Sequence, residues 1–306
     1  MSEISEQIVK NFPDILQNED LSRHCTFGIG GPADYFYTAK TADDLAKIVK
    51  FAHEHKTQFF IIGAGSNVLF DDKGFRGIVI KNASDSIEFS ENTVTADSGV
   101  SIARLMTEAI KNNLSGLESW VGLPGTVGGA VRGNAGCNGL ETKDILVSAL
   151  LFNPDTAETI KVPADYFEFG YRHSKLKDTD EIVLKATFSL STKVLSPEEQ
   201  KNLMRNIQEH RVKTQPFGAS TGSFFKNPSN DSPAGMLIDK AGLKGKTIGH
   251  AQISEKHGNF ILNLGGATSH DVISLAKLAK HEVKAMFGIE LKSEVQILSE
   301  TGKMEI

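Results

Sequence analysis

Cysteine is scarce in this chain of 306 residues, which contains only Cys25 and Cys137. The two lie far apart in the sequence, and neither belongs to a CxxC or a Cys/His pattern. Two such residues do not form the disulfide framework of a small secreted domain, and their spacing predicts no zinc site. We therefore expect a protein of a reducing cytoplasm that holds no metal.

Long apolar runs are also missing. No stretch reaches 18 consecutive apolar residues, and the first 20 residues mix Glu, Lys and Asn with scattered apolar positions. A membrane-spanning helix needs a longer apolar run, and a signal peptide needs a compact apolar segment near its start. We expect neither a membrane span nor a signal peptide.

Charge of one sign is not concentrated anywhere in the sequence. The chain has 33 Lys and Arg against 38 Asp and Glu, so its net charge is 33 − 38 = −5. No long block of like charge could follow a nucleic-acid backbone, and nucleic acid is not an expected partner. With 40% hydrophobic residues, a chain of this length can bury a large core in two or three domains.

The hydrophobic pattern predicts a mixture of helices and strands. Helices are expected over 1–22 with an interruption at Pro13, from Thr41 onward with Asp44 in a capping-box-like start, and over 101–112, 196–211, 234–241 and 269–287. The last of these should begin at a Ser269 cap and end at Gly288. Strands are expected over 59–62, 68–70, 77–80, 93–96, 145–152, 182–190 and 289–298.

A glycine-containing loop, Gly63-Ala64-Gly65-Ser66-Asn67, directly follows the strand at 59–62. A Rossmann fingerprint would require a third glycine where Val68 stands, and a helix rather than a second strand after the loop. Successive N–H groups could instead converge on a diphosphate, with the Ser66 and Asn67 side chains as further donors. The alternative is a tight β-turn without a ligand.

Glycine is dense between Gly122 and Gly136, where six of fifteen residues are glycine. Such a run lets the backbone turn sharply, or lets it approach a flat ligand or a phosphate where a Cβ would intrude. Long glycine loops in compact domains are usually functional, although a purely structural loop stays possible. We interpret the segment as a second ligand-binding loop.

Polar side chains gather in three later segments. Arg172, in the run 169–174, could clamp a carboxylate or a phosphate, or could form an ordinary surface salt bridge. The cations and the amide in 210–216 suit an anionic substrate, but basic residues also commonly occur at the end of a helix. The segment Gly222-Ser223-Phe224-Phe225-Lys226-Asn227-Pro228 sets a hydroxyl, an ammonium and an amide among two aromatics, and this composition indicates a site.

Glu294 lies in the strand predicted over 289–298. Alternation places it on the face of Lys292 and Gln296, opposite Leu291, Val295 and Ile297. By spacing alone, Glu294 is a solvated strand carboxylate.

In order and over the whole chain, these segments resemble the UDP-N-acetylenolpyruvoylglucosamine reductases, the MurB family. The resemblance is carried by residues 26–33, 63–67, 122–129, 171–174, 222–228, 242–245, 254–260 and 293–295. The short span between Tyr171 and the 190s resembles the second subtype of the family. Two positions depart from the family pattern: Gly28 replaces a common basic residue, and Cys137-Asn138 replaces a usual Ala-Tyr.

The resemblance implies an α+β fold. An FAD-binding region of vanillyl-alcohol-oxidase (PCMH) type, in two subdomains, would precede an α+β substrate-binding domain. We expect an N-terminal helical segment at 1–22, FAD-binding subdomains at 23–80 and 81–193, and the substrate-binding domain at 194–306.

The resemblance also implies an activity, the NADPH-dependent reduction of UDP-N-acetylglucosamine enolpyruvate to UDP-N-acetylmuramate in peptidoglycan precursor synthesis. Hydride would pass from NADPH to N5 of FAD and then to the enolpyruvyl ether. Because the chain has no Rossmann module, we expect NADPH and the nucleotide sugar to use one cleft in turn, with ping-pong kinetics. We expect a cytoplasmic monomer.

Carried onto this sequence, the family pattern makes Ser223 the proton donor to the carbon that bears the carboxylate. Arg172 and Glu294 would stabilise the enolic intermediate, and Glu294 would have to be protonated in order to donate. The predicted FAD-binding residues are Gly63, Ala64, Gly65, Ser66, Asn67, Gly122, Pro124, Gly125, Thr126, Gly128, Gly129, Asn134 and Gly136. The predicted substrate-binding residues are Tyr171, Arg211, Lys213, Gln215, Lys226 and Asn227.

Two other classes of function remain open at this point. An FAD oxidase of the same fold, acting on an alcohol or a sugar, would react with oxygen and would not need the segment 222–228. A non-enzymatic nucleotide-sugar sensor would bind its ligand without turnover, and the joint presence of Arg172, Ser223 and Glu294 argues against it.

Overall fold

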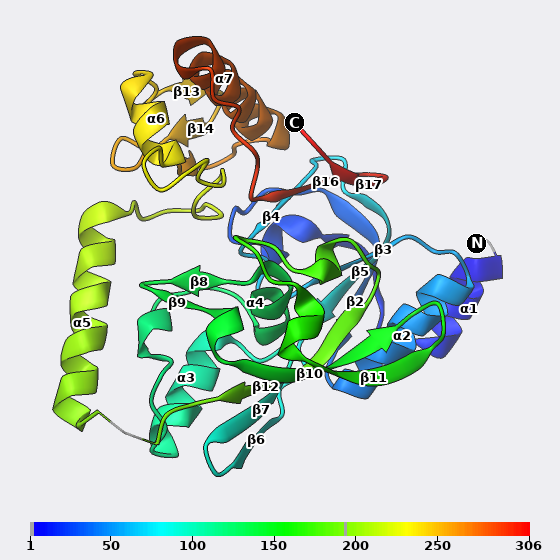
Figure 1. Ribbon diagram of the computed structural model, residues 1–306. Helices are drawn as coiled ribbons and strands as arrows, with labels where there is room; N and C mark the ends of the chain where they lie inside the picture. The colour runs from blue at the N-terminus through cyan, green and yellow to red at the C-terminus, as the bar shows by residue number, and fades with distance from the viewer. Residues whose placement is uncertain (1–2, 193–194) are drawn as a thin grey trace. The chain divides into compact units, whose positions relative to one another are not determined.

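A computed structural model describes residues 3–192 and 195–306 (Figure 1). Its chain divides into two compact units. The first unit contains the residues up to Ile15, Tyr37–Ala64 and Val79–His210. The second contains Leu16–Phe36, Gly65–Ile78 and Arg211–Ile306. Two of the unit boundaries fall inside strands, β2 (Pro32–Ala39) and β5 (Phe75–Asn82), so each of these strands contributes residues to both units.

The first unit is built on a five-stranded antiparallel sheet of order β11-β10-β12-β7-β6. Its strands are β6 (Ile87–Ser90), β7 (Thr93–Asp97), β10 (Leu146–Asn153), β11 (Glu158–Pro163) and β12 (Ile182–Ser189). Side chains of α3 (Ile102–Lys111) and α4 (Val127–Gly133) share one buried cluster with those of the sheet. Trp120, 1% exposed, meets Phe188 edge to face in this core, with ring centroids 6.4 Å apart.

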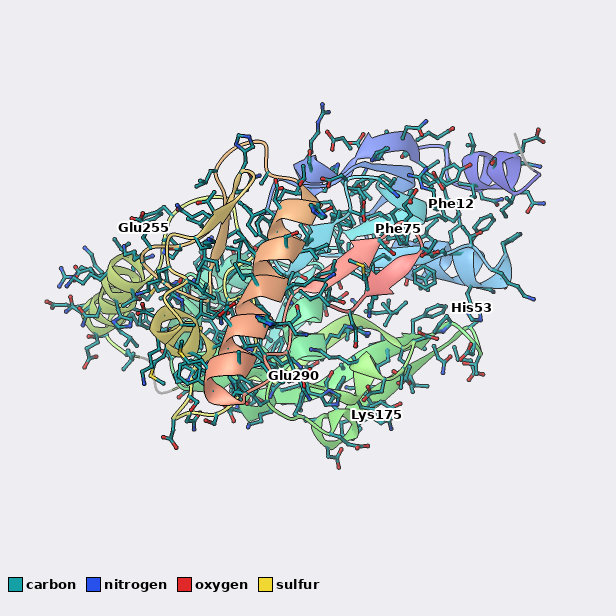
Figure 2. The ribbon with its side chains drawn as sticks, turned by 90° about the horizontal axis from the view of Figure 1, so that it is seen from above. Phe12, His53, Phe75, Lys175, Glu255 and Glu290 are labelled. Carbon is teal, nitrogen blue, oxygen red and sulfur yellow. The ribbon has the colours of Figure 1, made fainter. Side chains whose placement is uncertain are left out.

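Two helices near the start of the chain also belong to the first unit. These are α1 (Glu3–Asn11) and α2 (Ala42–Glu54). Phe12, which is labelled in Figure 2, packs its ring against that of Phe51, with ring centroids 5.2 Å apart. The predicted start of α2 is confirmed, since Thr41 Oγ1 accepts from the N–H of Asp44 at 3.0 Å. The strand β3 (Phe59–Ile62) follows as predicted.

The helix predicted over 1–22 is wrong beyond Asn11. Pro13 ends α1 because proline lacks an N–H and its ring collides with the preceding helical turn. Residues Leu16–Asp20 instead form strand β1, paired antiparallel with β2, and a 3₁₀ helix covers Leu21–His24. The amphipathic stripe itself is confirmed where the helix exists, because Ile8 is 1% exposed.

The second unit contains two small three-stranded sheets and two helices. One sheet has the order β13-β14-β15, formed by Thr247–Ile248, Ala251–Ile253 and Ile261–Asn263. The other has the order β17-β16-β4, formed by Gly302–Met304, Gln296–Ser299 and Val68–Phe70, with β4 and β16 parallel. Figure 1 shows α6 (Ala234–Lys240) and α7 (Ser269–Phe287) beside β13 and β14, and apolar residues of these elements form the second core.

The start of α7 differs from the prediction by one residue. The cap is Thr268, which forms a reciprocal capping box with Asp271, and Ser269 is the first helical residue. Ser269 instead donates through its N–H and its hydroxyl to the carboxylate of Asp72, at 2.9 and 2.7 Å. The predicted end is confirmed, because Gly288 adopts a left-handed φ of 69°.

The strand predicted over 289–298 is shorter than expected and begins only at Gln296. Its predicted inward face is nevertheless confirmed, because Leu291, Val295 and Ile297 are all buried. Residues 292–294 form local pairings with the segment 224–226 instead of continuing the sheet. The remaining α-helix of the described residues is α5 (Pro197–Thr214), and the remaining strands are β8 (Gly136–Cys137) and β9 (Leu140–Glu141).

Candidate functional site

The two predicted glycine loops meet inside the first unit. A Cβ built on Gly63 would lie 2.4 Å from Oγ1 and 2.8 Å from Cγ2 of Thr126. Real Cβ atoms do not approach neighbours so closely, so the loop after β3 can contact Thr126 only because residue 63 is glycine. The sequence separation of 63 residues gave no sign of this contact.

The second part of the 63–67 loop belongs to the second unit and is equally constrained. Gly65 has a φ of 64°, and a Cβ there would lie 2.0 Å from the carbonyl oxygen of His24. Asn67 donates from Nδ2 to the carbonyl of Glu294 at 3.2 Å, and its own carbonyl accepts from the N–H of Gln296 at 3.1 Å. The loop is therefore fixed at Gly65 by close packing and at Asn67 by hydrogen bonds. The bond from Asn67 to the Glu294 carbonyl links a predicted FAD-binding residue to a predicted catalytic residue.

The segment from Gly122 to Gly136 is not a loop throughout, as the sequence had suggested, because α4 occupies Val127–Gly133. Glycine inside this helix has a packing reason: a Cβ on Gly128 would lie 2.9 Å from Cβ of Ser98, and the Gly128 N–H donates to the Ser98 carbonyl at 2.8 Å. The glycines thus permit close backbone packing in addition to turning the chain.

Asn134 ends α4 in the left-handed conformation, with a φ of 42°, and is completely buried. Its Nδ2 donates to Glu141 and to the Gly170 carbonyl, both at 2.9 Å, and its Oδ1 accepts from the Lys143 N–H at 3.0 Å. The bonds from Lys143 and Asn134 hold the pKa of the Glu141 carboxyl below its ordinary value. Asn134 therefore fixes the end of the glycine segment to the residues that precede Arg172.

Arg172 lies at the corner of a tight turn in the first unit. Gly170 and His173 bond each other through both their N–H and C=O groups, which leaves Tyr171 and Arg172 at the tip. Arg172 has a φ of 54°, a conformation that few residues other than glycine adopt. Its Nη1 donates to the Gly136 carbonyl at 3.0 Å.

The aromatic neighbour of this turn is the more exposed of the two tip residues. Tyr171 is 51% exposed, and the Arg172 guanidinium lies 5.7 Å from the centre of its ring. The structure thus brings together Arg172, Tyr171 and two residues predicted to bind FAD, Asn134 and Gly136.

The chemistry of the glycine segments fits the pyrophosphate of FAD. Residues 63–67 and 122–136 contain no carboxylate and offer backbone N–H groups and hydroxyls. A Cβ on Gly129 would come no closer than 3.8 Å to Oγ1 of Thr126, its nearest neighbour, so the backbone there is open to a ligand. Arg132 adds a cation within the same segment, and burial lowers the pKa of its guanidinium.

Ser223 is exposed in the second unit, and both residues after it are buried. Gly222 turns the chain with a φ of 76°, and Phe224 and Phe225 then enter the core with 0% and 2% exposure. Their rings lie 5.1 Å apart, edge to face. The two buried rings anchor the segment, while the Ser223 side chain stays at the surface.

The segment of Glu294 pairs with the segment of Ser223. The N–H groups of Glu294 and Val295 both point at the Phe224 carbonyl, at 2.9 and 3.5 Å, which is the two-against-one pattern of a β-bulge. Lys226 donates through its N–H to the Lys292 carbonyl at 2.9 Å. The backbones that carry the two predicted catalytic residues of this unit are therefore adjacent.

The remaining predicted substrate-binding residues lie in the second unit. Lys213 is exposed, whereas Arg211, Gln215 and Lys226 are half-buried. Asn227 has a structural task as well, because its Oδ1 accepts from the N–H of Ala234 at the start of α6, at 3.1 Å. Each predicted residue is placed within its own unit, and their roles toward a substrate stay predictions.

Asn259 is a residue to which the sequence analysis assigned no role. It is 2% exposed, and its side-chain amide bonds both the N–H and the carbonyl of Phe225, at 2.9 and 2.8 Å. Its place inside the motif 254–260 was the available signal, but an asparagine in a sequence does not reveal which backbone it bonds.

Comparison with known proteins decides the family. Residues 213–298 match the model for the C-terminal domain of UDP-N-acetylenolpyruvoylglucosamine reductase, and residues 33–161 match an FAD binding domain. The UDP-N-acetylenolpyruvoylglucosamine reductase of Chlamydia abortus is 42% identical over 280 residues, which cover 91% of this chain and 92% of the relative. The chain belongs to the UDP-N-acetylenolpyruvoylglucosamine reductase family.

Two further members of this family cover nearly the whole chain. The protein of Carboxydothermus hydrogenoformans is 38% identical over 306 residues, covering 98% of this chain and 99% of its own length. The crystal structure of the Thermus caldophilus enzyme is 33% identical, covers 93% of this chain and 98% of its own, and superposes with a TM-score of 0.77. The predicted family, fold class and FAD cofactor are confirmed by these matches.

Neither a membrane-spanning helix nor a metal-binding cluster is present among the described residues. In 3–192 and 195–306, no helix combines the length and the apolar character needed to cross a membrane. The same ranges hold no group of three or more His, Cys, Asp or Glu side chains arranged to bind a metal ion.

Proposed function

We propose that this chain is an FAD-containing, NADPH-dependent reductase that converts UDP-N-acetylglucosamine enolpyruvate to UDP-N-acetylmuramate in peptidoglycan synthesis. The observation that carries the proposal is the placement of Ser223, an exposed hydroxyl on a segment whose next two residues are buried and bonded on both sides. A proton donor must be both accessible and held in place. Family membership supplies the substrate class.

Residues 63–67 and 122–136 would hold FAD. When bound, FAD supplies hydride transfer from NADPH to the substrate. The glycine contacts at Gly63 and Gly65 set the path of the first loop, and Thr126 touches it from the second. The backbone N–H groups and hydroxyls of these segments would orient the cofactor and balance the charge of its pyrophosphate.

The substrate is an enol ether conjugated to a carboxylate. As hydride reaches its terminal carbon, the double bond becomes single and negative charge develops on the other carbon and on the carboxylate. A cation aimed at that carboxylate stabilises the charge, and we assign this role to Arg172. Its fixed guanidinium, bonded to the Gly136 carbonyl at 3.0 Å, is suited to a two-point contact with a carboxylate.

Ser223 then completes the reduction. Its hydroxyl gives a proton to the carbon that bears the carboxylate, which forms the new C–H bond and leaves a serine alkoxide that solvent reprotonates. The weak acidity of serine is adequate because the carbon it protonates is strongly basic. Glu294 would share in stabilising or protonating the same enolic intermediate.

We assign the substrate contacts to Tyr171, Arg211, Lys213, Gln215, Lys226 and Asn227. The three cations among them would bind the diphosphate and the carboxylate. The division into segments 1–22, 23–80, 81–193 and 194–306, the cytoplasmic location and the monomeric state are further parts of this proposal.

Anaerobic stopped-flow absorbance tests the function directly. The purified protein is reduced with NADPH and then mixed with UDP-N-acetylglucosamine enolpyruvate. We expect the flavin band to bleach and then to return at a rate that depends on the concentration of the enol ether. A reduced flavin that only oxygen reoxidises would favour an oxidase, and a colourless protein that still binds the nucleotide sugar would favour a sensor.

A further inference from the structure

The segment 223–226 is bonded along both edges, and one side chain makes most of the bonds on one edge. On the first edge, the Glu294 N–H donates to the Phe224 carbonyl and the Lys226 N–H donates to the Lys292 carbonyl, both at 2.9 Å. On the second edge, the partner is Asn259, through its backbone and through its side chain.

Asn259 forms hydrogen bonds with three backbone groups on two consecutive residues of this segment. Its carbonyl accepts from the Phe224 N–H at 2.8 Å, its Oδ1 accepts from the Phe225 N–H at 2.9 Å, and its Nδ2 donates to the Phe225 carbonyl at 2.8 Å. The side-chain amide therefore acts as one more residue of a β-strand, with a donor and an acceptor facing the same neighbour. The neighbouring residues on the two segments also pair, because Ser223 forms an isolated antiparallel β-bridge with Phe260.

The chemistry of the position admits few other side chains. Asn259 and Phe225 are each 2% exposed, so water cannot replace a lost bond at the Phe225 backbone. Aspartate would keep the acceptor and lose the donor, and alanine or leucine would lose both. Asparagine is the side chain of this length that satisfies the N–H and the carbonyl of one residue together.

Asn259 is itself held from the opposite direction. Its N–H donates to Nδ1 of His257 at 3.2 Å. The preceding Gly258 lies so close to α6 that a Cβ there would be 2.5 Å from the Gly235 carbonyl oxygen. The backbone of Asn259 is therefore fixed, so its side-chain amide can hold the backbone of Phe225 in place.

We propose that Asn259 is the positioning residue of the proton donor, which holds the Ser223 hydroxyl in register by fixing the backbone of Phe224 and Phe225. The inference rests on the proposed function of Ser223. Asn259 forms hydrogen bonds with Phe224 and Phe225, which come immediately after Ser223 in the chain. A shift of their backbone therefore moves the Ser223 hydroxyl as well. Asn259 acts on the proton transfer alone and has no part in the transfer of hydride from NADPH.

The test compares Asn259→Ala with a matched variant, Asn263→Ala. Asn263 is an asparagine of the same unit that also bonds backbone, donating to the Phe27 carbonyl at 3.0 Å and accepting from the N–H groups of Gly265 and Ala267. Its loss removes comparable bonds without touching Phe224 or Phe225. We expect both variants to unfold at a lower temperature than the wild type.

Only Asn259→Ala should slow reoxidation of the reduced flavin by UDP-N-acetylglucosamine enolpyruvate, by up to about 100-fold, as a displacement of roughly 1 Å in a reacting group can produce. Reduction by NADPH and the Kd of the enol ether for the oxidised protein should stay near the wild-type values. Hydrogen exchange should accelerate at the Phe225 amide in Asn259→Ala and not in Asn263→Ala.

Equal reoxidation rates in the two variants would overturn the positioning role, as would equal losses in both half-reactions. If Asn259→Ala does not fold, Asn259→Asp replaces it, because aspartate keeps the bond from the Phe225 N–H. A selective loss of reoxidation in Asn259→Asp supports the inference, and wild-type reoxidation contradicts it. Failure of the wild type to be reoxidised by the enol ether would instead overturn the proposed function.

Discussion

Gly63 and Thr126 are in contact within the first unit, although 63 positions separate them in the chain. A Cβ on Gly63 would lie 2.4 Å from Oγ1 of Thr126, and the contact joins the two segments that we assign to FAD. Both segments must keep their positions to hold one cofactor. A change that pushes Gly63 and Thr126 apart should therefore lower the affinity for FAD.

Gly63→Ala should weaken FAD binding by about tenfold or more, since inserting a methyl group into a packed contact typically costs about 1–3 kcal/mol. The measurement is the Kd for FAD of the deflavinated protein, obtained by fluorescence quenching. The matched control is Gly235→Ala, because a Cβ there would also crowd a side chain, with Cε1 of His257 at 2.9 Å, and Gly235 lies in α6, outside the segments that we assign to FAD. Equal FAD affinity in Gly63→Ala and wild type would contradict the assignment of this loop.

Arg172 combines a functional side chain with an unusual backbone, and the two can be separated by mutation. Asparagine tolerates a left-handed φ better than most residues, so Arg172→Asn should keep the turn at 170–173 while it removes the charge. We expect its reoxidation by the enol ether to fall by about 10²- to 10³-fold, the usual effect of losing one group that stabilises developing charge.

Arg172→Lys is the companion variant. Lysine restores the charge but not the planar fork, so its reoxidation rate should lie between those of Arg172→Asn and the wild type. Reduction of the flavin by NADPH serves as the internal control in both proteins. Wild-type reoxidation in Arg172→Asn would show that this guanidinium does not bind the carboxylate.

Ser223→Ala should leave the first half-reaction intact and impair the second. Loss of a positioned proton donor typically lowers a rate by about 10²- to 10⁴-fold, and the exposed position of Ser223 predicts little change in stability. Single-turnover absorbance measures the two steps separately. Ser229→Ala, a change of an exposed serine farther along the same loop, is the control. A folded Ser223→Ala protein that loses both half-reactions would show that the role assigned to Ser223 is wrong.

His257 predicts a dependence of stability on pH. Burial, followed by the positive charge of Lys244, lowers the pKa of His257 from its ordinary value near 6.5. Its neutral Nδ1 accepts from the Asn259 N–H, and protonation would end that bond. Between the lowered pKa of the folded state and about 6.5, the unfolded chain binds more protons, so stability is complete above pH 6.5 and declines as the pH falls below it.

The measurement is the free energy of unfolding by urea at pH 7.5 and 5.5. His257→Asn is the control, because its Oδ1 can accept the same bond and does not titrate. The difference in stability between wild type and His257→Asn should shrink or reverse as the pH falls. A difference that is independent of pH would contradict the predicted shift. Lys244, which contributes to the shift, forms an ion pair with Asp239 at 2.7 Å.

The predictable part of the fold was local. The spacing of Leu45, Ile48, Val49 and Ala52 on α2, and the Thr41 cap, follow from the helical period and from the needs of the first N–H groups. The helix predicted over 1–22 failed where pairing of β1 with β2 overrode a weak amphipathic pattern. The last strand shortened because residues 292–294 pair with 224–226, a choice that depends on a segment about 70 positions away.

The same division holds for the site. From the sequence alone, ordered motifs determined the family and the FAD cofactor. They also supplied Arg172, Ser223 and Glu294, the residues to which we assign the chemistry, because residue types can be read at fixed positions. Only the tertiary structure decided that Gly63 touches Thr126, that Asn67 bonds the Glu294 carbonyl, and that Asn259 supports the backbone beside Ser223. Those contacts join distant parts of the chain, and a hydrogen bond to a backbone leaves no mark on the sequence of its partner.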